Sequence, residues 1–360
     1  MKNEKIGYID ALKGLAIIGI TVGHSGANLI DGWVGRLSCL GPTTVVIFLM
    51  LSGMLTEMSL DKHFGGEHIS FKSLLKWYKA RLIRLLPLFY VALFLSLLTG
   101  SWSQYWLGED KPVTVLNVIA HVFMVHGFFP HYVNSLMGLE WYVGVLFIFI
   151  LISPLLHRFI NTWWKAVMLL LVVFFANPLI ETYMFNHMPI MDDSIVYVGY
   201  IYSTGPFPNF TFFVFGMVLY FLFKKLNSIK LDDKKRCAIS YGLLCLSFVL
   251  IVLQYLYVIL GSPFTMNESY ALIYSLIIIS QMVRRSPVID NCVFRFFGKY
   301  SYGIYLFQYI VFNMYDKLIP YHGRGSWTIK FLVGLMVLLG VSFLLTKGVD
   351  KCIKQSRKSV

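Results

Sequence analysis

Charged side chains are scarce in this chain. Only 14% of its 360 residues are Asp, Glu, Lys or Arg, whereas 57% are hydrophobic. Soluble domains carry about 25% charged residues, so the deficit excludes an ordinary water-soluble domain and indicates that lipid is the solvent. Apolar runs of about 20 residues recur along the chain, the length that an α-helix needs to cross a bilayer. We therefore predict an all-α, polytopic transmembrane helix bundle.

Other features are missing as well. The apolar runs show no regular alternation of apolar and polar residues, which argues against an outer-membrane barrel. The five cysteines are scattered and odd in number, so neither a disulfide framework nor a zinc site is expected. No repeat, low-complexity linker or cleavable signal is visible. We expect one integral-membrane domain over residues 1–360, with a retained first span and no appended soluble domain.

The net charge of +13 would suggest nucleic acid as the partner of a soluble protein. Here membrane topology explains it, because Lys and Arg accumulate in cytoplasmic loops. Eleven apolar runs are candidate spans, and their ranges are 8–29, 40–59, 85–101, 114–129, 139–157, 166–181, 205–223, 237–260, 268–283, 301–316 and 328–347.

Lys and Arg cluster between the apolar runs. All of these clusters lie on the cytoplasmic side only if the 114–129 run does not cross the membrane. That run holds histidines and is followed by a proline, so it is expected to be re-entrant or to lie at the outer surface. Ten crossings then place 26 of the 31 Lys and Arg residues inside. We predict about ten spans, both termini in the cytoplasm and a multi-pass location in the cell (cytoplasmic or inner) membrane.

The first span carries ionisable residues, which are costly in hydrocarbon. At roughly 100° and 1.5 Å per residue, Lys13 and His24 differ by only about 20° around the helix and lie ~16 Å apart along it. Asp10 lies on the same side of the helix, so the three ionisable residues form one stripe along it. Lys13 can instead extend to the inner interface and pair with Asp10. Gly19 and Gly23 form a small-residue pair on another face, which favours a close neighbouring helix.

This stretch, IDALKGLAIIGITVGH at 9–24, resembles the opening motif of acyltransferase family 3. That motif has Asp-x-Leu-Arg-Gly, an apolar stretch and a His, with ten residues between Arg and His. The chain keeps this spacing but has Lys13 in place of Arg. Lysine keeps the charge and loses the bidentate fork.

Four later segments resemble further family motifs in the expected order. They are IFLMLSGML (47–55), YKARLIRLLPLFY (78–90), GLEWYVGVLFIFILISPLL (138–156) and FGKYSYGIYLFQ (297–308). In the last, Gln308 stands where the family commonly has His. Glu140 matches the family's acidic residue in the third of these segments.

The resemblance implies acyl transfer from a cytoplasmic donor, commonly acetyl-CoA, to a hydroxyl of an extracytoplasmic carbohydrate or glycoconjugate such as a surface polysaccharide. The ~16 Å between Lys13 and His24 is comparable to an extended pantetheine arm. Arg81 and Arg84 suit the donor phosphates because guanidinium donates two parallel hydrogen bonds, and with Lys13 and Asp10 they form the expected donor site. Alternatively, both arginines are ordinary positive charges that flank a membrane span on its cytoplasmic side.

A hydroxyl is a poor nucleophile at neutral pH, so a base is needed. His24 is the candidate, either as that base or as a transient acyl carrier. Glu140 could orient the imidazole as the acid of a triad does, or simply lie in the first turn of a helix. Candidate substrate-binding residues are the aromatic and hydroxyl side chains Trp141, Tyr142, Ser301, Tyr302 and Tyr305.

His121, His126 and His131 recur every five residues, which does not match the i, i+4 spacing of a two-histidine helix site. No metal is therefore expected, although these side chains could line the acceptor cleft. Two other classes of function compete with the enzyme. One is a transporter or flippase for a polysaccharide precursor or small glycoside, which the lack of repeated halves disfavours. The other is a membrane sensor, which has no need of the Lys13–His24 stripe.

Overall fold

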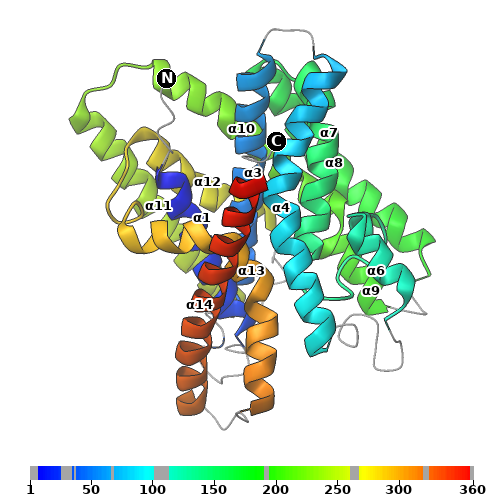
Figure 1. The fold of residues 1–360 in the computed structure, drawn as a ribbon. Helices are drawn as coiled ribbons and strands as arrows, with labels where there is room; N and C mark the ends of the chain where they lie inside the picture. Colours follow the sequence, from blue (N-terminus) through cyan, green and yellow to red (C-terminus); the bar gives the residue numbers. More distant parts are fainter. Residues whose placement is uncertain are drawn as a thin grey trace.

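The computed structural model describes residues 7–25, 35, 38–65, 69–100, 113–189, 194–259, 267–318 and 324–356. These residues fold almost entirely into helices (Figure 1), which confirms the predicted all-α class. The long helices are α1 (Gly7–His24), α3 (Val45–Phe64), α4 (Phe71–Thr99), α7 (Trp141–Phe159), α8 (Trp163–His187), α10 (Pro206–Ser228), α11 (Asp233–Ile259), α12 (Asn267–Val283), α13 (Cys292–Leu318) and α14 (Arg324–Ser356). The short elements are η2 (Pro42–Thr44), α6 (Val115–Val122), η3 (His126–Phe128), α9 (Ser194–Gly199) and the π-helical turn η4 (Tyr200–Thr204).

Seven stretches of the described chain are long and apolar enough to cross a membrane: Pro42–Phe64, Phe71–Thr99, Trp141–Phe159, Trp163–His187, Ile195–Ser228, Asp233–Leu256 and Phe331–Ile353. The multi-pass helical architecture is therefore confirmed. Three other expected spans coincide with α1, α12 and α13. Of these, α12 is only 17 residues long, and α1 carries Asp10 and Lys13. The total of ten spans and the cytoplasmic side of the termini stay predictions.

The 114–129 run does not form one continuous helix. Its helical part, α6, has eight residues and is about 12 Å long, well short of the ~30 Å hydrocarbon layer. A turn and the 3₁₀ segment η3 follow. This geometry agrees with the expectation that the run does not cross.

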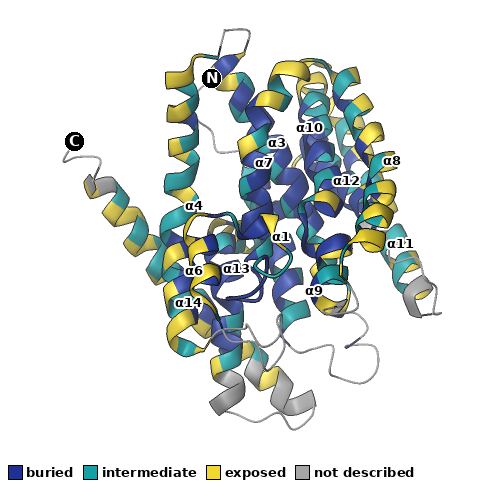
Figure 2. Ribbon diagram, turned by 90° about the vertical axis from the view of Figure 1, so that its right-hand side faces the viewer, coloured by how far each residue is buried: buried dark blue, intermediate teal, exposed yellow. Residues whose placement is uncertain are grey.

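The buried centre of the bundle is built from α1, α3, α7, α10 and α13. Figure 2 shows buried residues concentrated along α3, α7 and α10, whereas exposed residues follow α8. In the apolar stretch of α3 56% of the residues are buried, against 11% in α8. In Figure 1 the first turn of α1 and the last turn of α14 lie toward the same end of the bundle.

Glycines bring the central helices into backbone contact. A Cβ atom added to Gly14 of α1 would lie 1.8 Å from the Phe294 carbonyl oxygen, and one added to Gly298 of α13 would lie 1.6 Å from that of Asp10. The predicted pair Gly19 and Gly23 faces η2 instead, where a Cβ on Gly23 would meet Pro42 at 2.4 Å. Helix α1 is therefore fixed tightly between α13 and the start of α3.

Candidate active site

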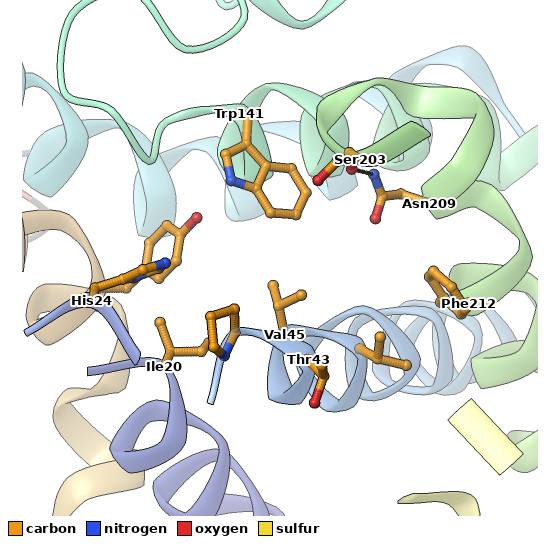
Figure 3. Close-up of a pocket in the computed structure, with 11 residues that line it drawn as sticks. Ile20, His24, Thr43, Val45, Trp141, Ser203, Asn209 and Phe212 are labelled. Atoms are coloured by element: carbon orange, nitrogen blue, oxygen red, sulfur yellow. Dashed lines mark hydrogen bonds between the residues drawn. The ribbon is translucent and has the colours of Figure 1, made fainter. Parts of the chain in front are cut away.

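A cavity of about 200 Å³ opens at the end of α1. Figure 3 shows His24 on one side of it and Ser203, Asn209 and Phe212 on the other, with Trp141 and Val45 between them. Its lining combines apolar, aromatic and neutral polar side chains: Ile20, His24, Pro42, Thr43, Val45, Val46, Trp141, Ser203, Asn209, Phe212 and Tyr305.

His24 is the last residue of α1 and lies against α13. Its ring centroid is 5.1 Å from that of Tyr309, and the neighbouring Gln308 side chain is fully buried. Nδ1 of His24 is buried and has no hydrogen-bond partner among the described residues. The protein thus leaves a nitrogen of this imidazole without a fixed proton donor or acceptor.

A second cavity of about 160 Å³ lies beside the first. Lys13 of α1 lines it, together with residues of α3, α4, α7 and α13: Val45, Phe48, Ser52, Leu55, Leu85, Tyr142, Leu146, Ser301, Tyr302 and Tyr305. Val45 and Tyr305 belong to both linings. The two cavities are therefore adjacent, with Lys13 at one and His24 at the other.

Tyr305 is held in place where the cavities meet. Its hydroxyl donates a hydrogen bond to the Leu139 carbonyl oxygen at 2.6 Å, and its ring packs on Tyr142 with centroids 5.4 Å apart. The Tyr142 hydroxyl in turn lies 3.0 Å from Oγ of Ser52. These contacts join α13, α7 and α3 at the boundary between the two cavities.

All five predicted substrate-binding residues line a cavity, but they divide between the two. Trp141 lines only the cavity of His24, and Tyr305 lines both. Tyr142, Ser301 and Tyr302 line only the cavity of Lys13. Tyr302 is fixed there by a hydrogen bond from its hydroxyl to the Leu85 carbonyl oxygen at 3.0 Å.

The predicted pairing of Glu140 with His24 is wrong. The Glu140 carboxylate is fully buried and accepts hydrogen bonds from the backbone N–H groups of Leu136, Met137 and Leu139. It also accepts one from Nε2 of His121 at 3.2 Å. A side chain with this many local donors folds back on its own loop, so it is unavailable to an imidazole on α1.

His121 completes this buried cluster. Its Nδ1 donates to the Asn117 carbonyl oxygen at 2.6 Å, and its Nε2 lies 3.2 Å from Oε1 of Glu140, so both ring nitrogens are engaged. The ring of His126 stacks on it with centroids 4.3 Å apart. Burial, with a smaller effect of His121, holds the pKa of His126 well below its usual range, so its ring is neutral.

The sequence allowed His121, His126 and His131 to line a cleft for the acceptor. The structure places them away from both cavities. None of them is among the described residues that line the two cavities. His131 packs instead against Tyr197, with ring centroids 5.3 Å apart. Within the described ranges, no group of three His, Cys, Asp or Glu side chains is placed to hold a metal ion.

The predicted phosphate-binding arginines lie on α4, outside both linings. The Arg81 guanidinium stacks on the Trp77 ring at 3.5 Å from its centroid, and Arg84 is exposed. Residues four apart share a helix face, so Arg81 lies one turn from Leu85, which lines the cavity of Lys13. Asp10 is partly exposed on α1, with its backbone against Gly298.

Sequence reasoning missed the residues opposite His24, chiefly Ser203 and Asn209. They belong to η4 and the start of α10, which the apolar pattern shows only as the beginning of a span. The sequence did contain a signal for an irregular segment here, because glycine and proline break regular helix. The residues are Gly205, Pro206 and Pro208.

In a comparison with protein families, a family model described as an acyltransferase domain, Acyl_transf_3, matches residues 6–347. The match therefore includes α1, both cavities and α14 as far as Lys347. Neither the curated proteins nor the solved structures contain a match to the chain.

Proposed function

The chain belongs to the acyltransferase 3 family, and we propose that it is a membrane O-acyltransferase that moves an acetyl group from cytoplasmic acetyl-CoA to a hydroxyl of an extracytoplasmic carbohydrate or glycoconjugate. Its place is the cell membrane, with both termini in the cytoplasm. Family membership favours this activity over transport or sensing.

The observation that carries the proposal is the pair of adjacent cavities along one helix. Lys13 and His24 lie on α1, ~16 Å apart along its axis, and each lines one cavity. Val45 and Tyr305 form the boundary that the two cavities share. A donor with a long, thin arm can enter beside Lys13 and present its thioester to His24.

The charged residues at the Lys13 end suit the donor. Lys13 supplies a positive charge at the cavity wall, and Arg81 and Arg84 supply two more on the adjacent face and edge of α4. Guanidinium and ammonium groups bind phosphate oxygens through charge-assisted hydrogen bonds. Asp10 lies near Arg295 and helps to position the cytoplasmic end of α1.

At the other end, His24 acts on the acceptor hydroxyl. As a base, it takes the hydroxyl proton while the oxygen attacks the thioester carbonyl carbon; the C–S bond breaks and the thiolate of CoA leaves. As an acyl carrier, an imidazole nitrogen first attacks the thioester and expels the CoA thiolate; the acceptor hydroxyl then attacks the acetyl group, the N–C bond breaks, and the freed imidazole takes the hydroxyl proton. Both routes need a neutral ring with one free nitrogen.

Glu140 has a positioning role in this proposal. It fixes the backbone of residues 136–139, and the Leu139 carbonyl oxygen accepts the hydrogen bond of Tyr305. Trp141, the next residue along, lines the cavity of His24. The carboxylate therefore holds two cavity walls in place without touching the reacting groups.

The test of this function is transfer of radiolabelled acetyl from acetyl-CoA by membranes from cells that express the chain. Label should enter alkali-labile esters of carbohydrate, and membranes lacking the chain should incorporate none. Lys13→Met should raise KM for acetyl-CoA about 10- to 100-fold, since a hydrogen bond to a charged group contributes about 1.5–3 kcal/mol.

Lys72→Met, at an exposed lysine near the start of α4, is the matched control and should leave KM unchanged. An equal KM for Lys13→Met and the wild type would remove Lys13 from the donor site. Absence of labelled ester with an intact chain would reject the function itself.

A further inference from the structure

The wall of the first cavity opposite His24 is built by an irregular part of the chain. The π-helical turn η4 ends at Thr204, and α10 begins at Pro206 after an extended Gly205. Isolated π-helical turns occur frequently at functional sites. This turn places the Ser203 side chain at the cavity, next to Asn209 of the first turns of α10 (Figure 3).

The sequence explains why Asn209 is held there. In a π-helical turn a carbonyl accepts from the N–H five residues later, and Pro208, five residues after Ser203, has no N–H group. The Asn209 side chain supplies a donor in its place. Its Nδ2 donates to the Ser203 carbonyl oxygen at 2.6 Å and to the Gly205 carbonyl oxygen at 2.8 Å.

These two bonds fix the direction of the amide. A primary amide nitrogen has two hydrogens, and both are used here. Turning the amide over would set Oδ1 against two carbonyl oxygens, so the observed orientation is the only favourable one. Oδ1 is therefore turned toward the cavity (Figure 3), and none of the hydrogen bonds among the described residues uses it. It can accept a hydrogen bond but cannot donate one.

The rest of the lining narrows the ligand further. Of the described residues around this cavity, none is Lys, Arg, Asp or Glu. An anionic group placed here would lose water without gaining a cation, which is costly. The Trp141 ring offers an apolar face of the kind that covers the C–H face of a sugar. The Ser203 hydroxyl adds a group that can donate or accept.

We propose that this wall binds an uncharged, hydroxyl-bearing ring of the acceptor, with Asn209 Oδ1 accepting a hydrogen bond from one hydroxyl while another faces His24. The assignment rests on the proposed acyltransferase function and adds the chemical class of the acceptor: a neutral sugar ring, as opposed to a uronate or a phosphorylated sugar. Asn209 and Ser203 are specificity-determining residues in this account.

The test compares p-nitrophenyl glucopyranoside with p-nitrophenyl glucuronide as acceptors for the full-length protein and acetyl-CoA. The two probes differ by a hydroxymethyl group against a carboxylate. The wild type should acetylate the neutral probe with a kcat/KM at least about tenfold higher. Ser203→Arg adds a cation beside Asn209 and should narrow or reverse this ratio.

Asn209→Leu should raise KM for the neutral probe and leave KM for acetyl-CoA unchanged. Asn161→Leu, at an exposed asparagine before α8, is the matched control and should change neither. Because Asn209→Leu also removes the two bonds to the π-helical turn, Ser203→Arg is the variant that keeps the test independent of folding.

Three results would overturn the assignment. They are equal use of both probes by the wild type, a ratio unchanged by Ser203→Arg, and acetylation of neither probe by a protein that still hydrolyses acetyl-CoA in a His24-dependent manner. The last result would reject the neutral-sugar acceptor and leave the proposed acyltransferase function intact. A protein that shows no His24-dependent turnover of acetyl-CoA at all fails the proposed function, and the acceptor assignment falls with it.

Discussion

Replacement of His24 by alanine is expected to lower acetyl transfer by about 10²- to 10⁴-fold, the contribution that a positioned base or acid makes in enzymes. The imidazole stands at the end of α1 beside the first cavity, and its buried Nδ1 has no partner among the described residues. Alanine removes the group that accepts the hydroxyl proton or carries the acetyl group, and no other histidine lines either cavity within the described chain.

The measurement is the initial rate of labelled ester formation at saturating acetyl-CoA. His63→Ala, at an exposed histidine near the end of α3, is the control and should keep the wild-type rate. Binding of acetyl-CoA should persist in His24→Ala, because Lys13 and the arginines of α4 are untouched. A rate within threefold of wild type, about 0.7 kcal/mol in barrier height, would exclude His24 from the chemistry.

Glu140→Gln is expected to destabilise the protein by about 1.5–3 kcal/mol, the contribution of a hydrogen bond to a charged group. Glutamine keeps the shape of the side chain but replaces one acceptor oxygen with an NH₂ group. That group would then face backbone N–H donors of residues 136–139, and Nε2 of His121 would lose its carboxylate partner. We expect a lower unfolding temperature and loss of transfer at temperatures where the wild type is folded.

Thermal unfolding in detergent followed by intrinsic fluorescence measures the first effect. Glu181→Gln, on the largely exposed helix α8, is the control. In a double-mutant cycle, His121→Asn and Glu140→Gln together should cost less than the sum of the single changes, since the pair is broken by either. At a temperature where Glu140→Gln stays folded, kcat should fall with KM for acetyl-CoA unchanged. Unaltered stability and kcat would contradict the positioning role.

The helical membrane architecture could be predicted from the sequence because lipid demands long apolar helices, a strong and local signal. The stripe on α1 could also be predicted from the sequence, because helical geometry fixes the separation of Lys13 and His24 before any tertiary contact is known. The glycine pair Gly19 and Gly23 correctly indicated a close approach, although the partner is the 3₁₀ turn η2, which precedes α3.

The partner of Glu140 could not be predicted. Its carboxylate is engaged by N–H groups of its own loop and by His121, contacts that depend on loop geometry and have no periodic signature. Likewise, the role of Asn209 arises only once the π-helical turn leaves the Ser203 carbonyl facing Pro208, which has no N–H group. The hydropathy pattern also does not fix the number of spans. Central helices such as α1 and α13 are surrounded by other helices, so they can carry charges that a lipid-facing span could not.

The most direct test of the account is transfer across a sealed membrane. Right-side-out vesicles from cells that express the chain are loaded with labelled acetyl-CoA, and their surface glycans remain outside. We predict alkali-labile label on those glycans when the donor is inside, none when the same donor is supplied only outside, and none with His24→Ala. Equal labelling from donor on either side, or labelling that survives the loss of His24, would contradict transfer from the Lys13 cavity to the His24 cavity.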